Sequence, residues 1–362
     1  MAEPLKDLYS PEFVTQLAGR VQAVFPAFTV DAFSHAVLSE GWDDLALKAR
    51  MRHITQCLRH HLPPDYADAV AILNQVAPHF SGYPAVIFPD FIQCYGLQDW
   101  DTSMAALHWM TRFSTAEFAV RPFLQQDQTR MLAIMQDWCD DENEHVRRLA
   151  SEGCRPRLPW AAELKDLRQN PEPLLPILDQ LKQDTSLYVR RSVANNLNDI
   201  TKDHPDLVLC WCRARLDQHQ DTDWLLRHAC RTLLKQADVR ALRLFDLQDA
   251  SHVAVVDLQL SSERLSIGDT LEFSFQLATE QAELGQLRVE YLIDYMKANG
   301  RRRAKAFQVR SKHFADNQTT ITCRQSFRQM STRRHYPGLH NVRIRVNGLE
   351  LASTEFTLVA AP

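Results

Sequence analysis

The spacing of apolar residues changes near residue 250 and divides the chain into two parts. Before that point apolar residues recur at intervals of three and four, as in Val146, Leu149 and Ala150. This spacing is typical of helices that pack along one face. Beyond it the period becomes two, as in Leu271, Phe273 and Phe275, which predicts half-buried strands. We therefore expect a helical domain over residues 1–248 and a β domain over residues 252–362.

The helical part carries further stripes of the same kind, one at Ala67, Val70, Ala71 and Val76 and another at Val189, Val193 and Leu197. Helix-breaking pairs interrupt the pattern at Pro63-Pro64, Pro89-Asp90, Asn170-Pro171 and His204-Pro205. These breaks predict separate helices of about ten to twenty residues.

The helical part also repeats. Asp141, Asp184 and Asp221 each stand five residues before an apolar residue and two cations, in Val146-Arg147-Arg148, Val189-Arg190-Arg191 and Leu226-Arg227-His228. Spacings of 43 and 37 residues resemble HEAT-like helical pairs, which stack into a solenoid. Each aspartate can cap a helix or brace the loop before it. The cations are either solvated surface or the lining of a groove that follows a phosphate backbone.

The β part reads as about seven short strands separated by turn signals. Those signals are Ile267-Gly268-Asp269, Asn299-Gly300, Pro337-Gly338 and Asn347-Gly348. This pattern suits a small β-sandwich of immunoglobulin type. The linker would lie near residues 245–252. The fold class is thus α + β multidomain, with a HEAT-like solenoid followed by a β-sandwich.

Composition narrows the functional classes. The net charge of −4 is unevenly distributed along the chain. Residues 251–362 carry 15 Lys and Arg against 11 Asp and Glu, whereas the rest of the chain is acidic. An anion-binding surface must therefore be a local patch on an acidic body. The eight cysteines contain no CxxC pair, and we expect neither a metal nor a cofactor. No apolar run is long enough to span a membrane, so we expect a cytoplasmic protein.

Residues 147–160 concentrate the candidate chemistry. This stretch holds four arginines, the carboxylate of Glu152 and the aromatic ring of Trp160. Arginines can hold phosphates, a carboxylate can stabilise a developing cation, and an indole can lie against a sugar or base. The stretch ends in a Pro-x-x-Pro corner at Pro156 and Pro159.

Three motifs resemble the AlkC branch of the AlkC/AlkD bacterial DNA glycosylases. They are Ser114-Thr115-Ala116-Glu117-Phe118-Ala119-Val120-Arg121-Pro122-Phe123-Leu124, the block 147–160 without Cys154, and Tyr188-Val189-Arg190-Arg191-Ser192-Val193-Ala194-Asn195-Asn196-Leu197-Asn198-Asp199-Ile200. The likeness runs from Leu5 through Lys48-Ala49-Arg50-Met51-Arg52-His53-Ile54 to about residue 248. An appended β-sandwich resembles one subgroup of that family.

The resemblance implies excision of N-alkylated bases from duplex DNA, chiefly 3-methyladenine, with 3-methylcytosine as a further substrate. It implies a HEAT-like fold and a reaction without full rotation of the damaged nucleotide into a pocket. The product would be an abasic site in base excision repair. Double-stranded DNA carrying alkylated bases would be the partner, and we expect a monomer. The alternative is a non-catalytic HEAT-repeat scaffold that binds DNA or protein.

The chemistry calls for a carboxylate. A base alkylated at a ring nitrogen leaves as a neutral molecule, so the enzyme must stabilise an oxocarbenium-like sugar and deliver water. Glu152 is our first candidate and shares a helix face with Arg148; the alternative is an ordinary Arg–Glu surface pair. Glu117 is the second; the spacing Ser114-x-x-Glu117 equally suits a capping box.

Aromatic and cationic residues complete the predicted site. Trp160 would stack on or wedge beside the lesion, or else cover the proline corner as an apolar lid. Phe118 is a lesion contact by family position, although its apolar run suits the core. The predicted phosphate ligands are Arg148, Arg155, Arg157, Arg190 and Arg191. Arg147 stays ambiguous, because adjacent helical residues point about 100° apart.

The β part carries two basic segments. Arg301, Arg302, Arg303 and Lys305 follow an Asn-Gly turn and suit a basic loop tip that contacts DNA. A second tip is expected at Arg333-Arg334-His335. The alternative for both is a charge run that keeps the surface soluble. No lysine stands in the block 147–160, so we expect no Schiff-base chemistry and therefore a monofunctional enzyme.

Overall fold

The computed structural model describes residues 4–247, 250–330 and 333–360, and these form two compact units. Unit 1 comprises residues 1–204 and 215–229, and unit 2 comprises residues 205–214 and 230–362. The linker expected near residues 245–252 includes residues 248 and 249, which lie outside the described residues. Within the described part of the chain, no helix is both long and apolar enough to cross a membrane.

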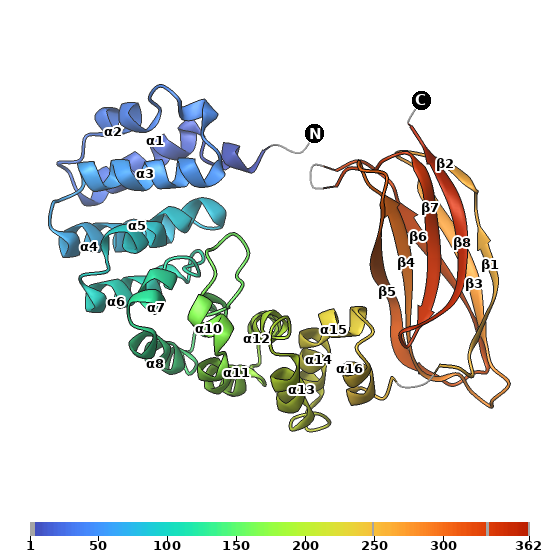
Figure 1. The fold of residues 1–362 in the computed structure, drawn as a ribbon. Helices are drawn as coiled ribbons and strands as arrows, with labels where there is room; N and C mark the ends of the chain where they lie inside the picture. The colour runs from blue at the N-terminus through green and yellow to red at the C-terminus, as the bar shows by residue number, and fades with distance from the viewer. Residues whose placement is uncertain (1–3, 248–249, 331–332, 361–362) are drawn as a thin grey trace. The chain divides into compact units, whose positions relative to one another are not determined.

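Unit 1 is a stack of helices that follows the order of the chain (Figure 1). Its helices are α1 (Pro11–Val24), α2 (Val30–Val37), α3 (Leu47–His61), α4 (Tyr66–Val76), α5 (Ile87–Tyr95), α6 (Trp100–Met110), α7 (Arg121–Gln126), α8 (Gln128–Trp138), α9 (Glu144–Gly153), α10 (Lys165–Gln169), α11 (Leu175–Leu181), α12 (Leu187–Ile200) and α14 (Gln220–Ala229). Successive repeats meet where α9 packs on α12 and α12 on α14. The predicted HEAT-like class is confirmed.

Individual helices depart from the expected pattern in two places. Ala67 and Ala71 are exposed on α4, whose buried face is instead formed by Ala69, Val70, Ile72, Leu73 and Val76. Pro89 does not separate helices, because it lies in the first turn of α5. A proline is tolerated there, since the amide that it lacks would have had no partner within the helix.

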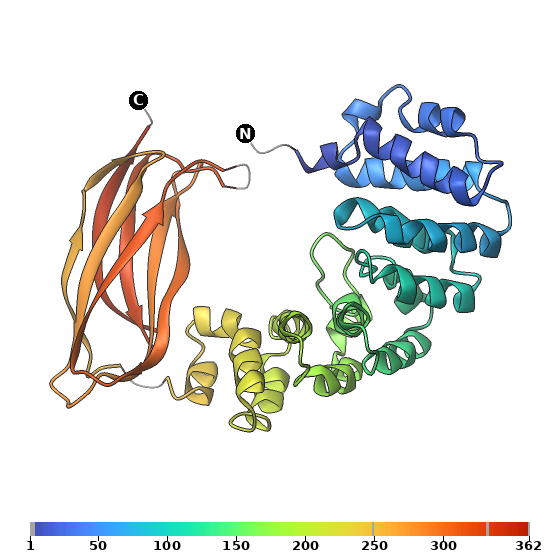
Figure 2. The same cartoon turned by 180° about the vertical axis from the view of Figure 1, so that it is seen from behind.

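Unit 2 joins three helices to a β-sandwich. The helices are α13 (Pro205–Arg213), α15 (Arg231–Lys235) and α16 (Val239–Leu244). The strands are β1 (Ala254–Leu260), β2 (Arg264–Ser266), β3 (Thr270–Ala278), β4 (Gly285–Met296), β5 (Arg302–Phe314), β6 (Gln318–Ser326), β7 (Gly338–Val346) and β8 (Leu349–Val359). They form sheets ordered β1-β3-β6 and β2-β8-β7-β4-β5, seen from both sides in Figures 1 and 2.

The core of the sandwich follows the predicted period of two. Leu271, Phe273 and Phe275 are buried from β3, whereas Glu272 between them is exposed. The predicted Asn347-Gly348 turn joins β7 to β8 with both residues at positive φ, which Asn and Gly tolerate best. The immunoglobulin-like architecture is therefore confirmed, although the sequence pattern did not reveal β2 or β5.

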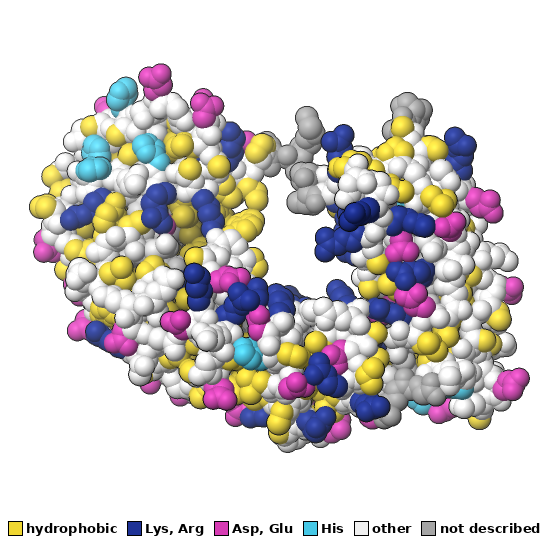
Figure 3. Space-filling view, viewed as in Figure 1, with side chains coloured by type: hydrophobic (Ala, Val, Ile, Leu, Met, Phe, Trp, Pro, Cys, Tyr) yellow, Lys and Arg dark blue, Asp and Glu magenta, His cyan; other side chains and the backbone are white. Residues whose placement is uncertain are grey.

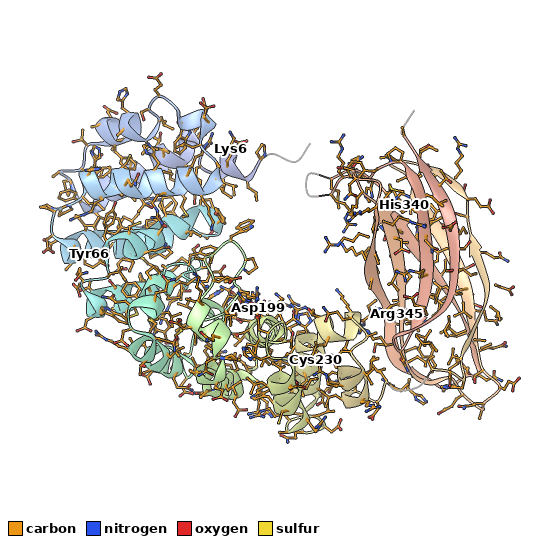
Figure 4. The ribbon with its side chains drawn as sticks, in the orientation of Figure 1. Lys6, Tyr66, Asp199, Cys230, His340 and Arg345 are labelled. Carbon is orange, nitrogen blue, oxygen red and sulfur yellow. The ribbon has the colours of Figure 1, made fainter. Side chains whose placement is uncertain are left out.

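The sandwich packs on the helices of its own unit. A Cβ on Gly348 would lie 2.9 Å from Ala237 and Leu242, so the β7–β8 turn closely approaches the α15–α16 segment. Arg345, labelled in Figure 4, donates to the Lys235 carbonyl at 2.7 Å and pairs with the buried carboxylate of Glu290. The helix-to-strand change at residues 244–254 thus lies inside one compact unit.

Candidate functional site

Helix α9 presents Arg148 and Glu152 on one face, as their spacing of four predicts. The helix begins after Asn143, whose side chain accepts the His145 amide and so caps the first turn. Val146 and Leu149 are fully buried on the same helix. The core face of α9 therefore fixes where the charged pair points.

Glu152 is only 5% exposed and is surrounded by hydrogen-bond donors. One carboxylate oxygen lies 2.6 Å from the Arg155 Nη1 and 3.4 Å from the Arg148 Nη2. The other accepts a hydrogen bond from the Ser192 hydroxyl at 2.7 Å. Glu152 is therefore not part of an ordinary surface pair. Its carboxylate is largely shielded from water and held by these donors.

Glu117 lies in the turn before α7, and its carboxylate does not serve as a helix cap. The Ser114 amide donates instead to the Met110 carbonyl at 3.2 Å. Glu117 pairs with the Arg148 Nη1 at 2.6 Å and accepts from the Thr115 hydroxyl at 2.9 Å. Arg148 thus bridges the two carboxylates that the sequence singles out.

The charges continue beyond Glu152 through an acid that sequence reasoning did not select. Asp199 accepts from Arg155 at 2.8 Å and pairs with Lys202 at 3.0 Å. Figure 4 labels Asp199, on α12. The described contacts form one alternating chain of charges, which we call the acid–arginine network: Glu117, Arg148, Glu152, Arg155, Asp199 and Lys202. Asp199 falls within a family motif, but no spacing rule marked it.

Trp160 lies in the loop that follows α9. The residue is 63% exposed, so most of its surface is available for contact. Its backbone has φ +65°, a conformation that bulky residues rarely adopt. The indole meets the edge of Tyr83 with ring centroids 6.3 Å apart. The peptide carbonyl of Trp160 accepts a hydrogen bond from the Lys48 ammonium.

A cavity of about 400 Å³ opens beside Trp160. Phe118 lines it and is half-buried rather than part of the core, and the Lys48 ammonium lies 4.6 Å from its ring centre. Asp90 also lines it, buried and held by Arg52 at 2.8 and 3.0 Å. Lys48, Arg52 and Asp90 were not among the predicted site residues, because they meet the loop only through the tertiary fold.

Glu152 does not line this cavity, so the predicted residues do not all converge on one hollow. Arg121 connects the two regions. It lines the cavity and donates to the carbonyls of Gly153, Arg155 and Ala162 at 3.1, 2.9 and 2.5 Å. Burial lowers the pKa of Arg121 to about 10.

The first arginine of the first two repeated pairs joins neighbouring repeats. Arg147 donates to the carbonyls of residues 141 and 142 and to the Asp184 carboxylate. Arg190 does the same one repeat later, with the carbonyls of residues 184 and 185 and with Asp221. We call these two sets of contacts the repeat clamps. Asp141 and Asp184 also accept amides two residues ahead, which confirms that they brace their loops.

The predicted phosphate ligands therefore lie in different surroundings. Arg190 and Arg155 are buried and engaged by protein acceptors. Arg157 is held by Asp203 at 2.9 and 3.0 Å and by Glu163. Arg148 belongs to the acid–arginine network. Arg191 alone of the five is exposed, with no described side-chain partner within the part of the chain that the structure covers.

The basic segments of the sandwich come together. Arg302, Arg303 and Lys305 are not on a loop tip as predicted, because they belong to the edge strand β5, and only Arg301 lies before it. Arg303 and Lys305 share a cavity of about 270 Å³ with Lys297, Arg333, Arg334, Tyr295 and His335. Figure 3 shows Lys and Arg side chains gathered on this side of the sandwich. Cations on an edge strand also prevent unwanted strand pairing.

Comparison with known proteins covers both parts of the chain. The family model of DNA alkylation repair enzymes matches residues 99–233, and the model of the C-terminal Ig-like domain of the uncharacterised protein YhaZ matches residues 254–360. YhaZ of Bacillus subtilis is 44% identical over 353 residues, which are 97% of this chain and 98% of that protein.

One solved structure matches over the whole length. It is the alkylpurine DNA glycosylase AlkC of Pseudomonas fluorescens, bound to DNA containing an abasic-site analogue. The sequences are 41% identical, the TM-score is 0.94, and the match covers 99% of this chain and 100% of that one.

Proposed function

This chain belongs to the AlkC-type DNA alkylation repair enzymes, and from that premise we propose that it is a monofunctional DNA glycosylase. It hydrolyses the N-glycosidic bond of cationic N-alkylated bases in duplex DNA, chiefly 3-methyladenine and also 3-methylcytosine, without full base flipping. One observation carries the proposal: Glu152 is buried between Arg148 and Arg155, and Glu117 pairs with the same Arg148.

The reaction needs little help at the leaving group. The bond between C1′ and the base nitrogen breaks with its electron pair going to the base, which loses its positive charge. Positive charge then develops on the sugar, and a carboxylate nearby stabilises it. A water oxygen bonds to C1′, and its proton passes to the carboxylate or to solvent. Glu152 and Glu117 are the acids that we assign to these two tasks.

The arginines explain how such acids stay in place. Each carboxylate keeps a fixed orientation because a guanidinium holds it, and preorganised charges cost no reorganisation when the sugar cation forms. Arg148 has Glu117 on one side and Glu152 on the other, 2.6 and 3.4 Å away. The acids therefore stand a short distance apart with a common cation between them.

The remaining predicted residues supply binding. Trp160 and Phe118 are the proposed lesion contacts, since Trp160 is exposed and both line the 400 Å³ cavity. Arg191 is our first choice for a phosphate ligand, and Arg148, Arg155, Arg157 and Arg190 would reach phosphates only by giving up protein acceptors. On the sandwich, Arg301, Arg302, Arg303 and Lys305 remain proposed DNA contacts. We propose a monomer that acts on DNA in the cytoplasm.

The test is release of free base from duplex DNA methylated at ring nitrogens. The wild-type protein should release 3-methyladenine and leave sites that break only after alkali treatment, because a monofunctional enzyme leaves the strand intact. Strand cleavage without alkali would contradict the monofunctional assignment. Salt-sensitive binding to methylated DNA without any release of base would favour the scaffold instead.

A further inference from the structure

We propose that Lys48 is a positioning residue that fixes Trp160 in the pose from which it meets the damaged DNA. This inference rests on the proposed function and deepens it. Lys48 comes from α3, 112 residues before Trp160, and belongs to none of the repeated cation pairs.

Lys48 contacts both proposed lesion contacts at once. Its ammonium donates to the Trp160 carbonyl and lies 4.6 Å from the centre of the Phe118 ring. The first contact holds the backbone of the loop, and the second is a cation–π interaction that holds the side chain of the other aromatic. One ammonium group thereby links two aromatics from different elements across the mouth of the cavity.

Trp160 needs such a support. With φ at +65° its backbone is in a strained region that persists only where the surroundings impose it. Its indole is 63% exposed and touches Tyr83 only by an edge. Packing of the indole therefore does little to impose the strained conformation. Hydrogen bonds to the loop backbone, both within the loop and from side chains, must hold it instead.

The loop itself supplies two of them, since the Ala161 amide donates to the Leu158 carbonyl at 3.2 Å and the Leu164 amide to the Pro156 carbonyl at 3.1 Å. The side-chain hydrogen bonds to the loop backbone that we describe come from two cations. Arg121 binds the carbonyls of Gly153, Arg155 and Ala162 from the cavity side, and Lys48 binds that of Trp160. Burial lowers the pKa of the Lys48 ammonium, against the opposing charge of Asp90. Asp90 is itself held by Arg52 through both oxygens. Among the described contacts, Lys48 therefore has a carbonyl and a ring as its partners rather than a salt bridge.

Two other roles for Lys48 make different predictions. A direct phosphate contact would lower the salt dependence of DNA binding when Lys48 is removed, by a slope of about 0.9. A contribution to general stability would act on the whole protein and would add to the effect of any change at Trp160. The proposal assigns the effect of Lys48 on base release to Trp160, so that effect should disappear when the indole is absent; an effect that remained would have to pass through another contact such as Phe118.

The experiment is a double-mutant cycle on the full chain, measured as the single-turnover rate of base release. We expect Lys48→Met to slow release about tenfold, because a displaced contact residue costs rate far more than affinity. Trp160→Ala should slow it by at least as much, and the double variant should equal Trp160→Ala alone. Lys48→Arg should recover part of the rate. Lys182→Met, a lysine that pairs with Asp179 on α11, is the matched control.

A second readout does not depend on activity. In protein labelled with fluorotryptophan, the Trp160 resonance is assigned by its loss in Trp160→Phe. Lys48→Met should shift or broaden it in the free protein, and Lys182→Met should not. Additive effects in the cycle, a reduced salt slope, or an unmoved resonance would overturn the inference. A wild-type protein that releases no base would instead overturn the proposed function, and the resonance would still report on Lys48.

Discussion

The repeat clamps and the acid–arginine network are built from the same two residue types in adjacent positions, yet they use them differently. In a clamp, one arginine satisfies two backbone carbonyls and one carboxylate of the next repeat. In the network, each arginine lies between two carboxylates, as Arg148 lies between Glu117 and Glu152. The arginines of the clamps therefore pair with groups that hold neighbouring helices together. The arginines of the network instead hold the carboxylates of Glu117 and Glu152 in fixed positions.

The difference follows from helix geometry. Successive residues on a helix point about 100° apart, so two neighbouring arginines cannot face the same way. Arg147 and Arg190 pair with an aspartate of the next repeat. Their neighbours do not clamp: Arg148 joins the acid–arginine network and lies against the Tyr188 ring, whereas Arg191 is exposed. The position within the pair, rather than the charge itself, indicates which arginine clamps the next repeat and which is left for another task.

The largest expected effect lies in the network. Glu152→Gln should slow base release about 100- to 1,000-fold, the range seen when one preorganised electrostatic group is removed. The amide fills the same space and still accepts from Ser192, so DNA binding should change little. Release and binding are measured on the same methylated duplex. Release at the wild-type rate would remove Glu152 from the mechanism and leave Glu117, tested as Glu117→Gln.

The clamp should respond in the opposite way. Asp184→Ala removes the buried carboxylate of one clamp and leaves the Arg147 guanidinium and the Ser186 amide without it. We expect the free energy of unfolding to fall by about 2–3 kcal/mol in urea, since breaking a largely buried ion pair is costly. Base release at low temperature should stay near the wild-type rate.

Asp179→Ala is the matched control for the clamp, because the pair of Asp179 with Arg215 is more exposed than that of Asp184 with Arg147. Its loss should cost less than about 1 kcal/mol. An equal loss of stability in the two variants, or a collapse of base release in Asp184→Ala, would mean that clamps and network are not distinct.

The sequence predicts the fold well, because periodicity and repeats are local properties. The stripe of α9, the alternation of β3 and the Asn347-Gly348 turn each depend on residues within one element, and each is confirmed. The sequence pattern did not predict the strand β5, because basic residues lie near both of its ends and its apolar alternation is weak. An edge strand with one exposed face has little hydrophobic pattern to show.

The site was less predictable, because its contacts span distant parts of the chain. The pairing of Arg148 with Glu152 follows from spacing, but Glu117 could be separated from a helix cap only by knowing that the Ser114 amide is already used. Lys48 reaches Trp160 across 112 residues, and no periodicity encodes that contact. The sequence also could not reveal that Arg190 is buried and paired with groups of the protein itself.

A smaller effect separates the two members of one pair. Arg191→Ala should lower the salt slope of DNA binding by about 0.9 and weaken binding several-fold at low salt, as loss of one phosphate contact does. Arg190→Ala should leave the slope unchanged and lower the urea midpoint, because Arg190 is buried in a clamp. The two slopes are measured by titrating salt at fixed protein. Equal slopes for both variants would contradict the division by position.

The smallest expected effect concerns Arg157, which neither clamps repeats nor joins the network. The guanidinium of Arg157, with help from Arg168, holds the pKa of Asp203 below its usual 3.8. A lowered carboxyl pKa stabilises the fold above about pH 4, and that stabilisation is lost as pH falls through the lowered value. The difference in unfolding free energy between wild type and Asp203→Asn should therefore be constant from pH 7 to 5, below about 1 kcal/mol. It should shrink below about pH 4 as the pH falls toward and through the lowered pKa. A difference that does not shrink at all as the pH falls below 4 would show that Asp203 acts through something other than charge. Because this bridge is weak, Arg157 is the paired arginine that a phosphate could most readily recruit, and Asp203→Asn should then leave DNA binding equal or slightly tighter.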